Sequence, residues 1–263
     1  MPPKKNIKNE LIYPKVSVIT VCYNNALTIE RAVLSVKNQS YKHIEYIVVD
    51  GQSSDLTFDI VKKFSFVDKL ISEKDSGIYD AMNKGVSFAS GEIIAFLNAD
   101  DFYKGSNIVE QVVKKMLSSQ LDAVYGDVDF FAPENIKKIV RRYSSKNFSS
   151  KKLAYGFMPA HPALFMKKNI YKAVGKFNIK YRIAGDFDFI VRAFQNNNLK
   201  YLYVPEVFVS MQTGGISSSG LKATLTLNKE IMQSCQENGI DTNWIKLLSR
   251  YFVKIFEFMR FSF

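Results

Sequence analysis

Short apolar runs alternate with amphipathic stretches from Val16 to Asp101, and this alternation limits the possible folds more than any other feature of the chain. The runs are short, rich in Val and Ile, and typical of buried strands. They read VSVITVCY, YIVVD, KLIS and EIIAFLN. Strands that alternate with helices favour a parallel sheet covered by helices on both faces.

The stretches between these runs carry apolar residues at helical spacing. We expect Ser54 to be the N-cap of the second helix, because its hydroxyl can accept a hydrogen bond from a free backbone N–H. The predicted apolar faces are Ile29, Val33 and Val36, then Leu56, Ile60 and Phe64, and then Ile78, Met82, Val86 and Ala89.

Polar side chains follow each predicted strand. The carboxyl ends of parallel strands meet at one edge of a sheet, and ligands bind in the crevice beyond them. We therefore expect one crevice to be lined by Tyr23, Asn24, Asn25, Asp50, Glu73, Asp75, Asn98, Asp100 and Asp101. The adjacent carboxylates of Asp100 and Asp101 would repel each other unless solvent, a cation or a cationic ligand faced them.

The pattern changes beyond Asp122. AVYGDVDFF and IKKIVRRYS indicate two strands of an antiparallel or mixed extension, joined by a turn at APEN. A helix is predicted after HPALFM, and another within FNIKYRIAGDFDFIVRAFQNN, where Phe187, Ile190 and Phe194 share a face. No linker is evident, so we predict a single domain over residues 1–240 with two halves, at about 14–121 and 122–220.

The last stretch, NWIKLLSRYFVKIFEFMRFSF, predicts a basic amphipathic helix over residues 241–263. Its basic residues are expected to lie largely away from the apolar stripe. Such a helix fits an anionic membrane surface, the core of the chain or a dimer interface. The basic residues are Lys246, Arg250, Lys254 and Arg260, and the stripe is Trp244, Leu247, Leu248, Tyr251, Phe252, Ile255 and Met259.

Composition excludes several classes of protein. The formal charge of +11 attracts phosphates of any kind. Nucleic-acid binding is not expected, because the aromatic residues fall in predicted strand and helix cores rather than among the basic residues. Cys22 and Cys235 are too few for a disulfide framework or a cysteine zinc site. No run resembles a signal peptide or reaches the ~18 apolar residues of a spanning helix, so we expect a cytoplasmic protein.

The crevice lacks two common nucleotide motifs. No GxGxxG turn follows the first strand, and no GxxxxGK[ST] occurs, which argues against a dinucleotide fold and a P-loop. Carboxylates and amides around an aromatic at the first strand end suit a metal-bridged nucleoside diphosphate.

Five segments now carry a resemblance: PKVSVITVCYNN, YIVVDGQSSDLT, EKDSGIYDAMNKG, GEIIAFLNADD and AGDFDFIVR. Together and in this order they resemble the family 2 glycosyltransferases of the GT-A fold, especially bacterial enzymes of surface-polysaccharide assembly. The resemblance runs from about Pro14 to the GGIS at 214–217. It implies an α/β GT-A fold with a mainly parallel, Rossmann-like sheet, helices on both faces and a mixed extension on the acceptor side. Residues 14–121 would form the nucleotide-sugar half, and 122–220 the acceptor half.

The resemblance also implies roles for single residues. Tyr23 would flank the nucleobase, Asp50 would bind the base or ribose, and Asp75 and Asn83 would line the nucleotide pocket. Asp100 matches the metal-binding carboxylate of the family's DxD element, and Asp101 is assigned to the same metal, Mn²⁺ or Mg²⁺. Asn98 replaces the first Asp of that element. Its amide oxygen can accept from a ribose hydroxyl but brings no charge to the cation.

Asp186 corresponds to the family's catalytic base. An acceptor hydroxyl must lose its proton as it attacks the sugar carbon, and a positioned carboxylate can take it. Asp188, two residues along a helix, would face another direction. The implied reaction is inverting transfer from a nucleoside diphosphate sugar, expected to be a UDP-sugar, to a hydroxyl of a glycan or polyprenyl-linked acceptor in O-antigen-like or capsule-like polysaccharide biosynthesis.

Each residue also has a structural explanation. Asp50 and Asp75 suit turns, and Asp186 suits an ordinary helix N-terminus. Tyr23 suits a rim aromatic and Asn83 a helix surface, and His161 suits either a buried structural histidine or an acceptor ligand. Two other functions stay open: a nucleotidyltransferase, and a nucleotide-sugar-binding protein of the same fold without turnover. The sequence does not indicate the sugar, the base, the acceptor, the linkage or the oligomeric state.

Overall fold

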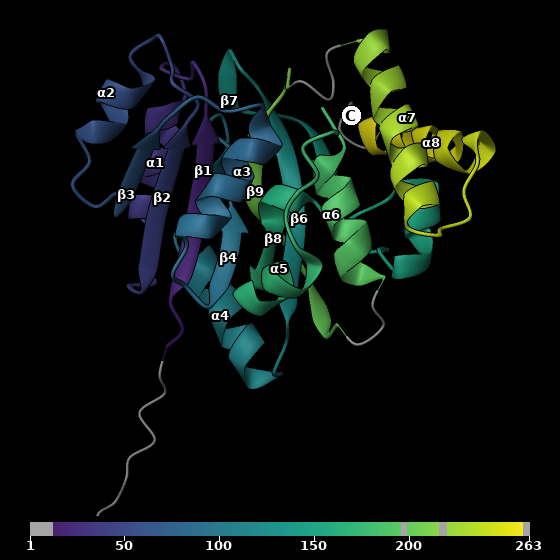
Figure 1. The fold of residues 1–263 in the computed structure, drawn as a ribbon, viewed down its shortest axis with the longest axis horizontal. Coiled ribbons are helices and arrows are strands. Elements are labelled where there is room, and N and C mark those ends of the chain that lie inside the picture. The colour runs from purple at the N-terminus through teal and green to yellow at the C-terminus, as the bar shows by residue number, and fades with distance from the viewer. Residues whose placement is uncertain (1–12, 196–198, 216–219, 260–263) are drawn as a thin grey trace, which may run out of the picture.

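The computed structural model describes residues 13–195, 199–215 and 220–259, and side chains as far as Tyr251. Their strands form one nine-stranded sheet in the order β3-β2-β1-β4-β8-β6-β9-β5, with β7 paired to β6 (Figure 1). The strands are β1 (Val16–Cys22), β2 (Ile44–Asp50), β3 (Lys69–Ser72), β4 (Ile93–Phe96), β5 (Phe102–Tyr103), β6 (Ala123–Ala132), β7 (Asn135–Tyr143), β8 (Leu164–Lys167) and β9 (Tyr201–Gln212).

The helices pack on both faces of this sheet. They are α1 (Ile29–Lys37), α2 (Thr57–Lys62), α3 (Ile78–Phe88), α4 (Ile108–Ser118), α5 (Lys168–Val174), α6 (Gly185–Phe194), α7 (Leu221–Glu237) and α8 (Trp244–Met259), with 3₁₀ turns η1 (Ser150–Tyr155) and η2 (His161–Ala163). Figure 1 shows α7 and α8 beside α6 at one side of the molecule.

The first half of the sheet is parallel, as the alternating pattern predicts. β1 pairs in parallel with β2 and β4, and β2 pairs in parallel with β3. The register places Cys22 opposite Asp50, and Asp50 opposite Ser72. The carboxyl ends of these strands are therefore level, and the loops that follow them share one edge.

The second half of the sheet is mixed. β8 runs antiparallel to both β4 and β6, and the predicted hairpin of β6 and β7 is confirmed. β9 runs parallel to β6 and antiparallel to β5. Neither β5 nor β9 is predicted from the sequence, because β5 is only two residues long and β9 contains Pro205, which is unusual within a strand.

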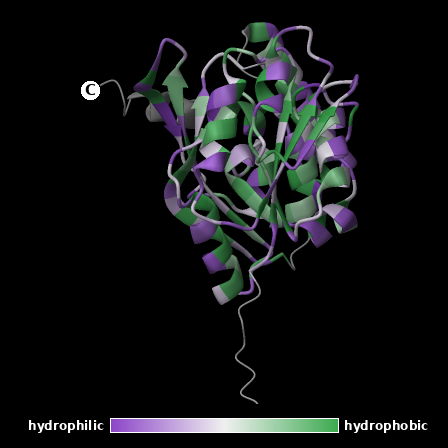
Figure 2. Cartoon of the chain, turned by 90° about the vertical axis from the view of Figure 1, so that its left-hand side faces the viewer, coloured by the Kyte–Doolittle hydropathy of each residue, from purple (hydrophilic) through white to green (hydrophobic). Residues whose placement is uncertain are grey.

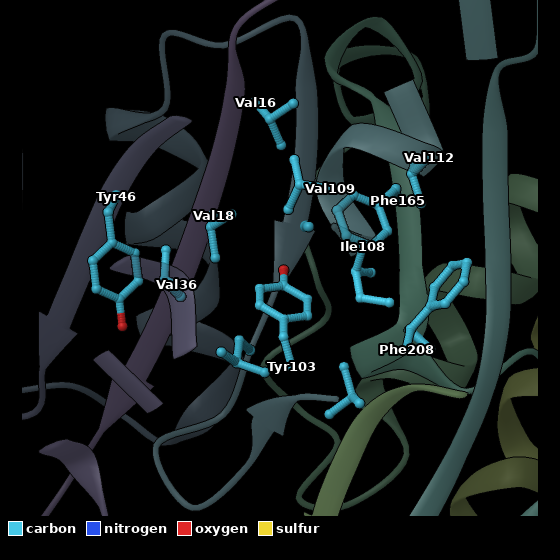
Figure 3. Close-up of a cluster of buried hydrophobic side chains, with 14 of the residues drawn as sticks. Val16, Val18, Val36, Tyr46, Tyr103, Ile108, Val109, Val112, Phe165 and Phe208 are labelled. Carbon is cyan, nitrogen blue, oxygen red and sulfur yellow. The ribbon is translucent and has the colours of Figure 1, made fainter. Parts of the chain in front are cut away.

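Two apolar cores cover the two faces of the sheet. One joins β1, β4 and β8 to α1, α2 and α4, and Figure 3 shows side chains of β1, α1, α4 and β8 filling part of it. The other joins the opposite side chains of the sheet to α3, α5, α6, α7 and α8. Figure 2 shows mainly hydrophobic strands inside and helices that carry both colours. Each fully buried aliphatic side chain contributes roughly 1.5–3 kcal/mol to stability.

The structure corrects two helix predictions. α2 begins at Thr57 rather than after Ser54, and Leu56, predicted to be buried, is 64% exposed. The reason is that the Ser54 N–H donates to the Asn24 side chain, so this segment ties two loops together instead of starting a helix. In α3 the buried face contains Tyr79 rather than Ile78, because the Tyr79 ring stacks on Phe177.

The structure also corrects the predicted polar face of the C-terminal helix. Arg250 is 4% exposed and donates to the carbonyl oxygen of Gly156 and to Asn228 Oδ1, both at 2.9 Å. Leu247 is fully buried beside it, so α8 packs on the domain through these two residues. Trp244 and Leu248 are about half exposed, and Ile245 is 82% exposed.

The rest of the predicted amphipathic pattern lies outside the described side chains, at Phe252, Lys254, Ile255, Met259 and Arg260. Whether residues 241–263 form a unit separate from 1–240 stays a prediction. Within the described part of the chain, no helix is both long enough and apolar enough to cross a membrane.

Candidate functional site

Tyr23, Gly51 and Asp75 meet at the carboxyl ends of β1, β2 and β3. A Cβ atom at Gly51 would lie 2.4 Å from Asp75 Oδ2, so a larger residue would displace the Asp75 carboxylate, and it would lie at an ordinary contact distance of 3.5 Å from Tyr23 Cδ2. The Tyr23 side chain is 62% exposed, and its ring is free to stack on a planar ligand. Asp75 accepts the Gly77 N–H at 2.9 Å and is half-buried.

Asp50 lies at the same edge but faces inward. Its side chain is 1% exposed and accepts hydrogen bonds from the Ser53 backbone N–H at 3.1 Å and the Ser72 hydroxyl at 2.6 Å. The Ser53 hydroxyl also donates to it. These bonds fix the turn after β2. A role in binding the base or ribose stays a prediction and would add to these contacts.

The loops after β1 and β2 are tied to each other. The Asn24 N–H donates to Ser53 Oγ at 2.8 Å, and the Ser54 N–H donates to Asn24 Oδ1 at 2.9 Å. Asn24 and Gln52 both have positive φ, 54° and 62°, which is uncommon for residues other than glycine. Backbone strain of this kind concentrates at binding sites, where the surrounding bonds hold the loop in one shape.

Asn83 does not join this group. Its side-chain amide donates to the Phe177 carbonyl and accepts the Phe177 N–H, at 2.9 and 2.8 Å. It also lines an open hollow of about 500 Å³ between α3 and the loop before α6. These two bonds hold the loop at Phe177, and a role of Asn83 in the nucleotide pocket stays a prediction.

Asn98, Asp100 and Asp101 follow β4, and the two carboxylates face different surroundings. Asp101 is 1% exposed and accepts from Asn98 Nδ2 at 3.0 Å and from the Gln212 N–H at 3.1 Å. Asp100 is half-buried, and no other described residue donates a hydrogen bond to its carboxylate. Burial raises the pKa of Asp100; burial, and then the Asp100 charge, raise the pKa of Asp101 well above its usual range.

Arg31 supplies positive charge behind this pair, which sequence reasoning missed. One guanidinium nitrogen donates to the Asp100 carbonyl at 2.7 Å and to Gln212 Oε1 at 3.1 Å. The guanidinium also lies over the Phe131 ring, 4.8 Å from its centroid. In the sequence Arg31 looks like an ordinary helix-surface cation, so only the contact between α1 and the loop after β4 reveals its role.

The residues around Asp100 fit a divalent cation. A half-buried carboxylate with a raised pKa and no donor from another residue is stabilised when a cation binds it. Within the described residues no three His, Cys, Asp or Glu side chains gather as a metal cluster, so a cation at Asp100 would take its other ligands from a bound diphosphate and solvent. Direct contact with Asp101 would require the cation to reach a carboxylate that is 1% exposed and already accepts hydrogen bonds from Asn98 and Gln212.

Asp186 lies in the first turn of α6, on an element separate from the strand-end carboxylates. Its Oδ1 accepts the Phe187 N–H at 2.8 Å and contacts the Tyr79 hydroxyl at 3.2 Å. Burial raises the pKa of Asp186 to about 6. A carboxylate with this pKa is ionised at neutral pH and is a stronger base than an exposed one.

Asp188 faces another direction, as its spacing predicts. It is 2% exposed, pairs with Arg192 at 2.9 Å and accepts the Ser234 hydroxyl of α7 at 3.0 Å. These contacts hold α6 in place and leave the Asp188 carboxylate turned away from solvent. The choice of Asp186 over Asp188 as the base therefore agrees with the surroundings of both side chains.

His161 is buried among aromatic rings. Its ring centroid lies 5.2 Å from that of Phe96 and 5.7 Å from that of Phe177. Burial lowers the pKa of His161 to about 4, so the imidazole is neutral at pH 7. His161 Nε2 has no hydrogen-bond partner within the described structure. The packing favours the structural explanation of this residue.

Comparison with known proteins agrees with this architecture. The Glycosyl transferase family 2 profile matches residues 17–173, more than half of the chain. The chain is 31% identical over 212 residues to a PGL/p-HBAD biosynthesis glycosyltransferase of Mycobacterium bovis, covering 78% of this chain and 80% of that protein. It is also 31% identical over 190 residues to the glycosyltransferase AglE of Haloferax volcanii, covering 68% and 61%.

Solved structures show the same fold at low identity. TarS residues 1–349 of S. aureus in complex with UDP match with a TM-score of 0.68 and 17% identity, over 91% of this chain and 72% of that one. The mannosyltransferase PcManGT of Pyrobaculum calidifontis, in complex with GDP-Man and Mn²⁺, matches with a TM-score of 0.64 and 20% identity, over 89% and 66%. A longer TarS chain is covered over only 43% of its length.

The profile match and the Mycobacterium bovis relative settle the family, and the structural matches agree with the fold described above. The chain therefore belongs to glycosyltransferase family 2, whose members transfer a sugar from a nucleotide-sugar donor, and it has the GT-A fold.

Proposed function

We propose that the chain is a metal-dependent inverting glycosyltransferase that moves a sugar from a nucleoside diphosphate sugar to a hydroxyl of a glycan or lipid-linked acceptor. The observation that carries this proposal is the separation of two carboxylates with different surroundings. Asp100 stands at the strand-end crevice without a donor from another residue, and Asp186 stands on α6 with a pKa of about 6.

The donor would lie across the carboxyl ends of β1 to β4. The exposed Tyr23 ring would stack on the base, Asp75 would accept a donor hydroxyl, and Asp50 would fix the turn between them. Asp100 would hold Mn²⁺ or Mg²⁺ together with the donor diphosphate. When bound, this cation would stabilise the negative charge that develops on the leaving diphosphate.

Asp186 would accept the acceptor's proton. As the acceptor oxygen forms its bond to the anomeric carbon, the bond from that carbon to the diphosphate oxygen breaks and its electron pair leaves with the nucleoside diphosphate. The proton of the acceptor hydroxyl passes to Asp186. A single displacement of this kind inverts the configuration of the sugar carbon.

The specific donor and pathway are inferred by analogy. TarS binds UDP and UDP-GlcNAc, and PcManGT binds GDP-Man and Mn²⁺, which supports a nucleotide-sugar donor here, expected to be a UDP-sugar, and a divalent cation. The Mycobacterium bovis relative acts in PGL/p-HBAD biosynthesis by its name, which supports a glycan or lipid-linked acceptor in a biosynthetic pathway. We place the enzyme in the cytoplasm, where nucleotide sugars are made, with the membrane surface as a candidate partner.

A panel of nucleoside diphosphate sugars tests this proposal. Each donor is incubated with the enzyme and Mn²⁺ or Mg²⁺, and the released products are measured. We expect slow release of a nucleoside diphosphate from one donor, lost in excess chelator. Release of pyrophosphate would instead identify a nucleotidyltransferase, and tight binding without hydrolysis or transfer would identify a binding protein.

A further inference from the structure

Glu230 of α7 binds the backbone that leads into the base helix. Its carboxylate accepts the N–H groups of Arg182, Ile183 and Ala184 at 2.9, 2.8 and 2.8 Å. Ala184 is the N-cap residue of α6, and Asp186 follows two residues later. One side chain from a distant part of the sequence therefore fixes the start of the helix that carries the base.

Tyr79 of α3 holds the same place from the opposite side. Its hydroxyl contacts Asp186 Oδ1 at 3.2 Å and also the Ile183 carbonyl oxygen. A Cβ atom at Gly185 would lie 2.7 Å from the Tyr79 ring, so the glycine lets the first turn of α6 lie directly against this ring. Burial, and then the Asp186 charge, raise the pKa of Tyr79 well above its ordinary value, so its hydroxyl stays protonated.

We propose that Tyr79 and Glu230 are positioning residues that hold the Asp186 carboxylate from two sides and set the pH range in which it works as a base. The proposal rests on the proposed function, because it takes Asp186 to be that base.

The single proton of the Tyr79 hydroxyl suits both states of Asp186. When Asp186 is ionised, the hydroxyl donates to Oδ1. When Asp186 has taken a proton, the hydroxyl can donate to the Ile183 carbonyl and accept from the new carboxylic acid. The bond to the ionised carboxylate is the stronger one, so Tyr79 favours ionisation on balance. The Glu230 charge acts in the other direction and disfavours ionisation.

The charged and titratable groups near Asp186 come from both packed helices. Tyr79 reaches it from α3 and Glu230 acts on it from α7, whereas Asp188 on the same helix is turned to Arg192 and Ser234. The two positioning residues therefore make opposite predictions for the pH dependence of the reaction.

The test measures kcat/KM against pH for the wild type, Tyr79→Phe and Glu230→Gln. Activity rises as Asp186 loses its proton, and a saturating concentration of Mn²⁺ keeps Asp100 ionised, so the acidic limb of the profile reports the pKa of Asp186. Tyr79→Phe should move this limb to higher pH by roughly half to one pH unit. Glu230→Gln should move it to lower pH by a smaller amount, because burial and the hydrogen bonds of Asp186 outweigh the Glu230 charge. Unmoved limbs in both variants would overturn the proposal, and an unmoved limb in one would overturn the role of that residue.

Matched controls come from a similar pair nearby. Tyr181 donates to Glu237 Oε2 of α7 at 3.0 Å, and in the described part of the chain the side-chain hydrogen bonds of Asp186 go to Tyr79 and Phe187 instead. Tyr181→Phe and Glu237→Gln should leave the limb in place, whereas limbs that moved as far as in the test variants would reveal a general effect of loosening α7. Asp186→Asn separates this proposal from the function. Full activity in that variant defeats the function itself, whereas an inactive Asp186→Asn together with unmoved limbs defeats only the positioning role.

Discussion

Asp100 and Asp101 are neighbours in the chain, but they differ in burial and in hydrogen bonding. Asp101 is almost fully buried and holds the loop to Asn98 and to β9 through Gln212. Arg31 offsets part of the negative charge from behind by binding the Asp100 carbonyl. These contacts explain how two adjacent acids can lie at a strand end, and under the proposed function the Asp100 carboxylate binds the cation.

Replacing Asp100 tests this division. Asp100→Ala should lose Mn²⁺- or Mg²⁺-stimulated activity, because no other described side chain replaces its carboxylate, while the fold stays intact. The matched control is Asp59→Ala, which removes a carboxylate from the outer part of α2. The measurement is a metal titration of donor hydrolysis. Full activity of the wild type in excess chelator, or an unchanged metal response of Asp100→Ala, would contradict the assignment.

At the scale of elements, a buried hydrogen bond from Ser234 to Asp188 holds α6 to α7. Asp188 pairs with Arg192 on its own helix and accepts the Ser234 hydroxyl from α7. Arg192 in turn donates to the carbonyl oxygens of Val174 and Lys176, which lie before α6. Asp188 therefore stabilises α6, the helix that carries Asp186.

Asp188→Asn should accordingly destabilise the protein. The change leaves Arg192 without its carboxylate partner, and breaking a largely buried pair costs about 2–4 kcal/mol. Urea unfolding measures the free energy of unfolding. The exposed pair of Lys246 and Asp241 provides the control. Asp241→Asn should change the free energy of unfolding by less than about 1 kcal/mol. If both substitutions lowered the free energy of unfolding equally, the buried contacts of Asp188 would not stabilise α6.

The alternation of strands and helices predicts the parallel half of the sheet well, because each strand carries its own local signal. Polar residues at strand ends likewise predict that Tyr23, Asp75 and Asp100 share one edge. Contacts between segments that are distant in the chain leave no local pattern in the sequence. The binding of Arg31 to the loop after β4 and of Glu230 to the backbone before α6 arises only when the elements pack. The predicted cap at Ser54 fails for the same reason, since a bond to Asn24 replaces it.

At the scale of the whole molecule, the C-terminal helix joins the domain and leaves part of its surface uncovered. Leu247 and Arg250 are buried against the domain, but Trp244, Ile245 and Leu248 remain exposed on α8. With a net charge of +11, an exposed apolar surface of this kind suits an anionic membrane. Removing the helix would also uncover the core around Leu247, so point substitutions test membrane binding more cleanly than truncation.

Cosedimentation with vesicles rich in anionic phospholipid tests this surface. The double substitution Ile245→Glu and Leu248→Glu should weaken binding by about tenfold or more, since it replaces apolar contacts with charges that the lipid repels. Ile136→Glu, at a half-exposed position on β7, should leave binding nearly unchanged. Equal binding of all three proteins, or no binding of the wild type, would contradict a membrane role for α8.

The measurement that tests the central claim most directly is the turnover of Asp186→Asn with the donor identified from the panel. The amide keeps the shape of the side chain but cannot take the acceptor's proton. We predict that kcat falls roughly 10²- to 10⁴-fold while the donor Kd stays nearly constant. A kcat close to that of the wild type, in a variant that folds and binds the donor normally, would contradict the assignment of Asp186 as the base.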